Sequence, residues 1–519
     1  MDNSKRKHLL YLGAFAALLP VLIFRDFTPS NELRYLSIAD EALSNNTFFA
    51  FTNHGLPYAD KPPLYLWAIM LCRWITGGHR MWLLSLFSIL PAFGIVHIMD
   101  RWTAQEIDEK NRSLARLMLL TCGLFVGVAV TLRMDMLMCF FIVLALRSFW
   151  RMFKNEGNYR REARLFPIYL FLATFTKGPL GLFIPFCSTI VFLAVSKHIR
   201  EFFRYWGWRT WGVLIFLCTF WFLAVYIEGG NEYLHNLLFK QTVGRAVKSF
   251  HHAEPFYYYA VSIWYILAPW ALLAIGTVAA ALRPKFMRSE LQVYFLSVII
   301  TVFVLLSAIS SKLQIYILPA IPFFIYAAAL LLPRFRDNVL VRLSIAVPAA
   351  IFSLAVPALL IVVKKTPDEM PYLNNVFFYA AAAILTLSGA YSLYHLYGKK
   401  CTAGVTGAIR TIAIGMLFAI FAGGFAIPEM NQYTGYGALC EKAMEISEAQ
   451  GITDIRTWHI SRPENMDVYL HRRVSIIDND DVPEADEKPY LLLTNKKYLE
   501  NFPEYDAMVT GLYAVVVCR

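Results

Sequence analysis

Residues 114–132, LARLMLLTCGLFVGVAVTL, and residues 136–152, MLMCFFIVLALRSFWRM, are two apolar runs separated by only Arg133, Met134 and Asp135. Each run is close to the roughly 20 residues that a helix needs to cross the hydrocarbon core of a bilayer. Arg133 and Asp135 are therefore expected where one membrane span ends and the next begins. Ionisable side chains at such a position are costly, so they are candidates for function by default.

The same pattern of long apolar runs and short charged loops continues through the chain of 519 residues. Hydrophobic residues make up 58% of it and charged residues only 16%, against about 25% charged residues in ordinary globular domains. We expect about thirteen spans, near residues 8–25, 81–100, 114–132, 136–152, 165–177, 179–196, 210–227, 257–281, 291–309, 313–332, 340–363, 376–397 and 411–427. The expected fold class is an all-α polytopic membrane protein with a small C-terminal α/β soluble domain.

Lysine and arginine are concentrated in every second loop, beginning with Lys5, Arg6 and Lys7 ahead of the first apolar run. By the positive-inside rule, this bias places the N-terminus in the cytoplasm, and the odd number of spans places the C-terminal region outside. The first run lacks a convincing cleavage site, so we expect it to remain as a span. Topology and anionic lipids account for the net charge of +11, which argues against a nucleic-acid partner.

The membrane domain is expected to cover residues 1–427 and to carry two long outer segments. Segment 26–80 contains an amphipathic helix at 31–45. Its apolar stretch 64–76 is too short to span, so we expect it to lie in the membrane interface. The second outer segment, 228–256, is polar and aromatic.

The composition changes at residue 428, where the content of charged residues rises. A helix is predicted at 437–449, and short apolar strands are predicted at 490–493 and 513–517. Residues 428–519 are therefore expected to form an extracytoplasmic α/β domain.

The ionisable residues of the expected outer face cluster at five places. In chain order they are Asn31-Glu32-Leu33-Arg34-Tyr35, Asp60-Lys61-Pro62-Pro63, Arg133-Met134-Asp135, Thr176-Lys177-Gly178-Pro179, and Arg245, His251 and His252 together with the stretch from Ser311 and Lys312 to Tyr316. Cations can hold the negative charge of a departing lipid phosphate, and a carboxylate can orient or deprotonate an acceptor. The set therefore predicts transfer of a group from a phosphate-linked lipid donor.

Each of these residues also has a structural explanation. Glu32 in the first turn of a helix is favoured by the helix dipole, and Asp60-Lys61 before two prolines can be a rigid turn. Arg133 and Asp135 can form an ion pair at the end of a span. His251 and His252 have no evident third partner, and the cysteines show no zinc spacing. We therefore predict no defined metal site, while dependence on a cofactor such as a divalent metal stays open.

The same places carry a family resemblance. The chain resembles the aminoarabinose-to-lipid A transferases and their relatives, the protein O-mannosyltransferases, which have the C-type membrane glycosyltransferase fold. The matching stretches occur in the family's order and at about its spacing, and they cover roughly residues 8–330: Asn31-Glu32-Leu33-Arg34-Tyr35, Tyr58-Ala59-Asp60-Lys61-Pro62-Pro63, Arg133-Met134-Asp135, Thr176-Lys177-Gly178-Pro179, Gly244-Arg245 with Glu254-Pro255-Phe256-Tyr257-Tyr258-Tyr259, and Ser311-Lys312-Leu313-Gln314-Ile315-Tyr316-Ile317-Leu318-Pro319.

The resemblance implies a glycosyltransferase of the bacterial inner membrane. It implies a sugar donor of the undecaprenyl-phosphate type, an acceptor such as lipid A or another glycolipid, contact with membrane lipids, and an inverting displacement at the anomeric carbon. For the donor phosphate it implies Lys61, Arg245 and Tyr316, with Lys312 close in sequence. It implies catalytic roles for Glu32 and Asp135, and a substrate cavity lined by Asn31, Arg34, Tyr35, Asp60, Arg133 and Lys177.

The chain departs from the family pattern in three positions. Asn31 stands where relatives have the Asp that is their expected catalytic carboxylate, and an amide cannot act as a base. Either Glu32 or Asp135 takes that role, or the acceptor is already an anionic phosphate, or the activity is altered. Asp60 stands where Glu is common, and Gln241 lies near a frequent His, which argues against a His-assisted or metal role there.

The sequence favours sugar transfer over two other functions. A lipid or glycan transporter is disfavoured because the chain shows no internal repeat and its candidate charges lie on one face rather than at the bilayer midplane. A glycan polymerase or ligase would need a large outer loop rich in Arg and His, whereas segment 228–256 is of modest length.

Overall fold

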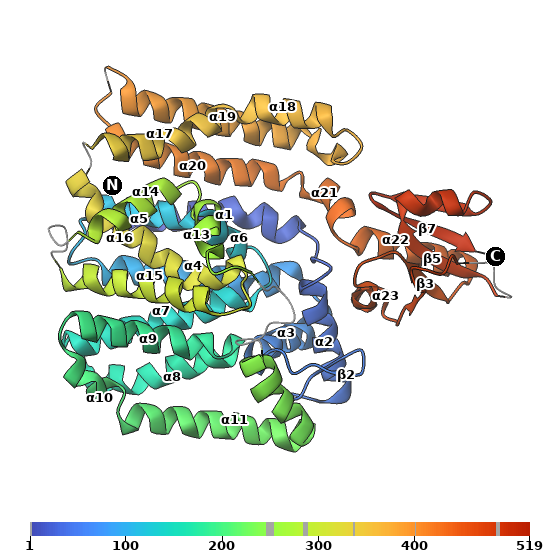
Figure 1. The fold of residues 1–519 in the computed structure, drawn as a ribbon. Coiled ribbons are helices and arrows are strands. Elements are labelled where there is room, and N and C mark those ends of the chain that lie inside the picture. Colours follow the sequence, from blue (N-terminus) through green and yellow to red (C-terminus); the bar gives the residue numbers. More distant parts are fainter. Residues whose placement is uncertain are drawn as a thin grey trace.

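The computed structural model describes residues 3–244, 254–283, 289–335, 338–399, 401–483 and 488–518. Figure 1 shows a bundle of helices that lie side by side, with a smaller sheet-containing part at one end. The first outer segment lies between the two, at the end of the bundle that faces the sheet. The fold class expected from the sequence, helical membrane bundle plus small C-terminal α/β unit, is confirmed.

Each predicted span coincides with a helix or with a pair of consecutive helices. These are α1 (Asn3–Phe24), α4 (Met81–Trp102), α5 (Glu109–Leu120) with α6 (Gly123–Ala129), α7 (Met134–Phe153), α8 (Tyr159–Lys177), α9 (Leu180–Val195), α11 (Trp208–His235), α13 (Tyr258–Ile266) with α14 (Ala271–Ala281), α15 (Glu290–Ala308), η4 (Gln314–Ala320) with α16 (Ile321–Phe335), α17 (Val339–Ser353) with α18 (Ala355–Lys365), α19 (Val376–Tyr397) and α20 (Gly404–Gly424).

Within the described residues, eight helices are long and apolar enough to cross a membrane, or ten when the bent pairs α5–α6 and α17–α18 each count as one span. The chain is therefore a multi-pass membrane protein, and the count of thirteen remains a prediction. The core is centred on α16, whose residues from Ile321 to Leu332 are all buried. A helix that is apolar all round needs such a position, surrounded by other helices.

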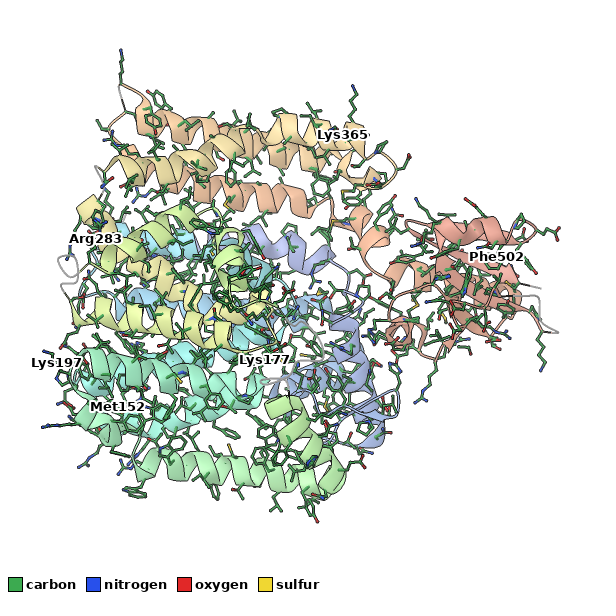
Figure 2. All side chains as sticks on the ribbon, viewed as in Figure 1. Met152, Lys177, Lys197, Arg283, Lys365 and Phe502 are labelled. Atoms are coloured by element: carbon green, nitrogen blue, oxygen red, sulfur yellow. The ribbon has the colours of Figure 1, made fainter. Side chains whose placement is uncertain are left out.

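Four labelled residues show where some of the predicted inner and outer loops lie. Figure 2 shows Lys197 and Arg283, both from predicted inner loops, at one end, and Lys177 and Lys365, both predicted outer, toward the other. The C-terminal unit lies on the side of Lys177 and Lys365. The positions of these four residues agree with the alternation of loops that the sequence predicts.

The first outer segment forms two helices and a small hairpin. Helix α2 (Glu32–Asn45) is followed by β1 (Thr52–Asn53), β2 (Leu56–Pro57) and α3 (Pro63–Thr76). The two residues between the strands, His54 and Gly55, both have positive φ, as a two-residue hairpin turn of type I′ requires. The carboxylate of Glu41 accepts bonds from the Thr52 hydroxyl and from the amides of His54 and Gly55, so it fixes the hairpin on α2.

The C-terminal unit is a five-stranded sheet with helix α22 (Gly437–Gln450) on one face. The strands are β3 (Ile455–Trp458), β4 (Ser475–Ile476), β5 (Tyr490–Asn495), β6 (Asp506–Thr510) and β7 (Tyr513–Cys518), in the order β4-β3-β5-β7-β6. Successive residues of β5 point to opposite faces. Leu491 and Leu493 pack in the cluster that contains α22, whereas Tyr490 and Leu492 pack with Trp458 on the other face.

One carboxylate joins the C-terminal unit to the end of the first span. Asp26 follows α1, and its side chain accepts hydrogen bonds from the Phe27 amide (2.7 Å), the Gly437 amide (2.9 Å) and the Tyr469 hydroxyl. Burial and the nearby Asp26 raise the pKa of Tyr469, so this hydroxyl stays a donor. The backbone comes so close that a Cβ on Gly437 would lie 2.8 Å from an Asp26 oxygen.

We expect Asp26→Ala to loosen the C-terminal unit, because it leaves the Tyr469 hydroxyl and the Gly437 amide without their acceptor. Each buried donor left unpaired costs about 1–3 kcal/mol. Hydrogen exchange on the full-length protein should show faster exchange in residues 437–470, whereas Glu448→Ala, an exposed carboxylate on α22, should leave exchange unchanged. Equal protection in the Asp26 variant would show that this carboxylate does not hold the unit in place.

Candidate active site

The carboxylate of Glu32 joins three segments of the chain. Arg25 donates to both of its oxygens in a bidentate pair, at 2.6 and 2.8 Å, and the amides of Thr28 and Leu132 donate to it at 2.7 Å each. The side chain of Glu32 is 1% exposed. Arg25 also donates to the Val130 carbonyl. The end of α1, the start of α2 and the connection between α6 and α7 therefore meet at one buried carboxylate.

Asn31 immediately precedes α2, and Arg34 and Tyr35 lie near the start of that helix. The Asn31 side-chain oxygen accepts a hydrogen bond from Arg34 Nη2 at 3.2 Å. The Arg34 guanidinium lies 5.9 Å from the ring centroids of both Tyr35 and Tyr58. Burial raises the pKa of Tyr35 to about 12, which keeps its hydroxyl protonated at neutral pH.

Asp60 and Lys61 lie just before α3. Lys61 Nζ donates to Asp60 Oδ2 at 2.8 Å, and the Tyr58 hydroxyl donates to the same oxygen at 3.3 Å. Pro62 is extended and Pro63 begins the helix, so the two prolines fix the chain direction after the pair. Both side chains of the pair are about one-sixth exposed, 16% for Asp60 and 15% for Lys61.

Asp135 and Lys177 form a buried ion pair between two helix ends. Helix α7 begins at Met134, so Asp135 lies in its first turn, where the helix dipole favours a carboxylate. Helix α8 ends at Lys177, in the predicted break before α9. Lys177 Nζ donates to Asp135 Oδ1, and Arg133 Nε lies 3.5 Å from Oδ2. Lys177 Nζ also lies 4.7 Å from the centroid of the Tyr316 ring.

These groups form one electrostatic cluster. Lys177 interacts with Lys61 and Arg133 as well as with Asp135. The charges of Arg34, Arg133, Asp60 and Asp135 all act on the pKa of Tyr35. Four cations, two carboxylates and three tyrosines from five parts of the chain thus lie together. Lys177, one of the cations, is labelled in Figure 2. Such a set can hold a phosphate and place a carboxylate beside it.

Lys312 does not join this cluster. Lys312 is buried, and its ammonium donates to the carbonyls of Glu254 (2.9 Å) and Ile309 (2.6 Å). Arg245 lies outside the described residues, as do His251 and His252. The backbone of Gln241 is in a described helical turn, Asn236–Gly244. In the described ranges, no three His, Cys, Asp or Glu side chains are grouped so that they could hold a metal ion.

Sequence reasoning missed Arg25, which is the partner of Glu32. The residue stands at the outer end of the first predicted span, in Phe24-Arg25-Asp26. A cation at an expected outer end is unusual under the positive-inside rule. This unusual position could have identified Arg25 as a candidate residue of the site.

No protein-family model matches the chain. An uncharacterised protein of Aquifex aeolicus is 25% identical over 314 residues, 59% of this chain and 61% of that protein. The undecaprenyl phosphate-alpha-4-amino-4-deoxy-L-arabinose arabinosyl transferase of Shewanella sediminis is 24% identical over 371 residues, 70% of this chain and 66% of that protein. The matched part is thus less than two thirds of either relative. The enzyme of the same name from Pseudomonas fluorescens is 22% identical, over 86% of this chain and 79% of the relative.

The whole chain also matches a solved structure. The crystal structure of ArnT from Cupriavidus metallidurans bound to undecaprenyl phosphate superposes with a TM-score of 0.77 at 17% identity, and the match covers 100% of this chain and 99% of that one. The apo structure of the same protein gives a TM-score of 0.76. The resemblance stated from the sequence is thereby confirmed: the chain is a relative of the aminoarabinose transferases and has their C-type membrane glycosyltransferase fold.

Proposed function

We propose that the chain is a membrane glycosyltransferase that moves a sugar from a polyprenyl-phosphate donor to lipid A or another lipid or glycan acceptor. The observation that carries this proposal is the cluster of Lys61, Arg133 and Lys177 around Asp135 at one end of the bundle. The names of the Shewanella and Pseudomonas relatives support it. So does the lipid phosphate bound in the ArnT structure of the same fold.

The cations of the cluster hold the donor phosphate. As the bond between the anomeric carbon and the phosphate oxygen breaks, that oxygen gains negative charge, which nearby ammonium groups stabilise. Lys61 and Lys177 supply this charge, Tyr316 lies against Lys177, and Arg245 joins them by its place in the family pattern. Lys312 is buried and donates to two carbonyls. It therefore fixes the backbone just before η4, the helix that carries Tyr316.

Asp135 is the carboxylate that we assign to catalysis. Asn31 cannot accept a proton, and both oxygens of Glu32 are already bonded to Arg25 and to two amides, so Glu32 positions the loop. Asp135 is held by Lys177 and Arg133 beside the donor cations. The acceptor oxygen attacks the anomeric carbon opposite to the departing phosphate, which inverts the configuration. A neutral hydroxyl acceptor passes its proton to a carboxylate, whereas a phosphate acceptor has none to pass.

The enzyme lies in the bacterial inner membrane with its N-terminus in the cytoplasm and its C-terminal domain, residues 428–519, outside. In this orientation the cluster faces the outer leaflet, and residues 1–427 form the transmembrane domain. The concentration of basic residues in loops at the end that carries Lys197 and Arg283 supports it, because such loops stay in the cytoplasm. The donor and acceptor then reach the site within the outer leaflet.

Lys61→Ala and Asp135→Asn are each expected to reduce transfer at least about 100-fold, because each removes charge that acts on the transition state. The measurement is mass spectrometry of glycolipid formed by purified protein in liposomes that contain a polyprenyl-phosphate sugar and lipid A. Lys442→Ala, which removes a lysine of the C-terminal domain that is paired with Glu445, is the matched control. Wild-type rates in either site variant would overturn the assignment of the cluster.

Glu32→Gln is expected to lower stability rather than remove the chemical step. The amide keeps one acceptor oxygen but loses the charge opposite Arg25, and breaking a buried pair costs roughly 3–5 kcal/mol. Thermal unfolding of the purified variant should begin at a clearly lower temperature, while transfer per folded molecule stays within about threefold of wild type. A variant of normal stability with no transfer would instead make Glu32 the catalytic base.

A C-terminal fusion tests the orientation. Alkaline phosphatase fused after the C-terminal domain should be active, because that enzyme matures only outside the cytoplasm. A green fluorescent protein fused at the same point should stay dark after export through the general secretion route. The reverse pattern would place the cluster on the cytoplasmic face and contradict the proposed orientation.

A further inference from the structure

A pocket lies between α2, the β1–β2 hairpin and the C-terminal domain, apart from the cluster around Asp135. Its volume is about 770 Å³, within the usual range of ligand sites, about 300–1,000 Å³. None of its lining residues belongs to the cluster around Asp135. Its charged walls are formed by Asp40, Glu41, Arg73, Asp467, Arg472 and Arg473.

The carboxylates of this pocket are already bonded within the protein. Asp40 accepts from Arg73 Nε at 3.0 Å and from His79 Nε2 at 2.9 Å. Glu41 holds the hairpin through three bonds. Asp467, at the start of α23 (Asp467–Leu470), accepts from the Ser37 hydroxyl at 2.7 Å. These contacts join the outer segment to the C-terminal domain and make a built pocket rather than a loose gap.

Arg472 and Arg473 differ from these carboxylates. They follow α23 after His471, whose φ of +53° turns the chain toward the pocket. In the part of the chain that the structure describes, neither arginine forms an ion pair with a carboxylate. Arg472 Nη1 donates to the Thr453 carbonyl at 3.2 Å, and Arg473 is exposed. Their remaining guanidinium donors are available to a ligand that carries anionic oxygens.

One wall of the pocket belongs to α3, the helix that the sequence predicts to lie in the membrane interface. Helix α3 exposes Leu71, Trp74 and Ile75, by 51%, 77% and 63% respectively. A helix with such an apolar face lies in the membrane interface. Arg73 belongs to this helix and lines the pocket, so one wall stands where the headgroups of outer-leaflet lipids would be.

We propose that this pocket binds the phosphate-bearing sugar headgroup of the lipid acceptor. The arginines bind the phosphate through paired N–H donors, while the acceptor sites that remain on the wall carboxylates accept hydrogen bonds from the sugar hydroxyls. The donor phosphate has its own cations in the Lys61 cluster, so the two lipids occupy separate places. That the ligand is the acceptor rests on the proposed function, whereas the ligand chemistry rests on the pocket alone.

The test compares Arg472→Ala/Arg473→Ala with wild type, using the full-length protein. Two probes are used: glucose 1-phosphate in solution, and lipid A, a diphosphorylated glucosamine disaccharide lipid, in nanodiscs. Because even one charge-assisted contact contributes about a tenfold effect, the loss of both arginines should weaken the binding of lipid A at least about tenfold. Lys442→Ala/Lys497→Ala removes the same charge from the C-terminal domain outside the pocket and should bind like wild type.

Unchanged lipid A affinity in the double variant, or no saturable binding by wild type, would overturn the proposal. The proposal would also be overturned if the double variant bound glucose 1-phosphate more weakly but lipid A normally, because the pocket would then bind a soluble sugar phosphate. Thermal unfolding checks that the variant is folded. A further outcome separates the two proposals. If wild type binds lipid A and the double variant does not, but wild type transfers no sugar, the pocket assignment stands and the proposed function is contradicted.

Discussion

The arrangement of the site depends on the buried pair between Arg25 and Glu32. Removing two such charges from water costs several kcal/mol per ion, and only well-placed hydrogen bonds offset that cost. Here both Glu32 oxygens are occupied by Arg25 and by the amides of Thr28 and Leu132. The pair therefore fixes the start of α2 against the connection that leads to Arg133 and Asp135. A movement at either segment would leave a charge buried without its partner.

The C-terminal domain also contacts the segment between α1 and α2. Asp26, next to Arg25, binds the Gly437 amide and the Tyr469 hydroxyl, and Asn465 donates to the Pro29 carbonyl. The segment that carries the site is thus held between the bundle and the sheet domain. In the proposed enzyme, this places a rigid polar site at the membrane surface, where lipid-borne substrates can reach it.

Several residues of the site could be predicted from the sequence. Arg133, Asp135 and Lys177 stand out because apolar runs end at them, and the order of the motifs brings Lys61 and Tyr316 to the same place. The partners of Glu32 could not be predicted, because Leu132 lies 100 residues away and its amide carries no sequence signal. Lys312 resembles a phosphate ligand in sequence, but it bonds two carbonyls. Strand β4 has two residues, too few for periodicity, and the pocket between α2 and the C-terminal domain joins residues from opposite ends of the chain.

In the proposed reaction, the cluster around Asp135 transfers a sugar from a lipid phosphate to an acceptor. Mass spectrometry of polyprenyl-phosphate sugars and surface glycolipids from cells with and without the gene tests it most directly. Loss of the gene should leave one lipid-linked sugar in excess and one glycolipid without its sugar modification, and both changes should be reversed by the wild-type gene. Identical lipid profiles in the two strains, under conditions in which the protein is produced, would contradict the account.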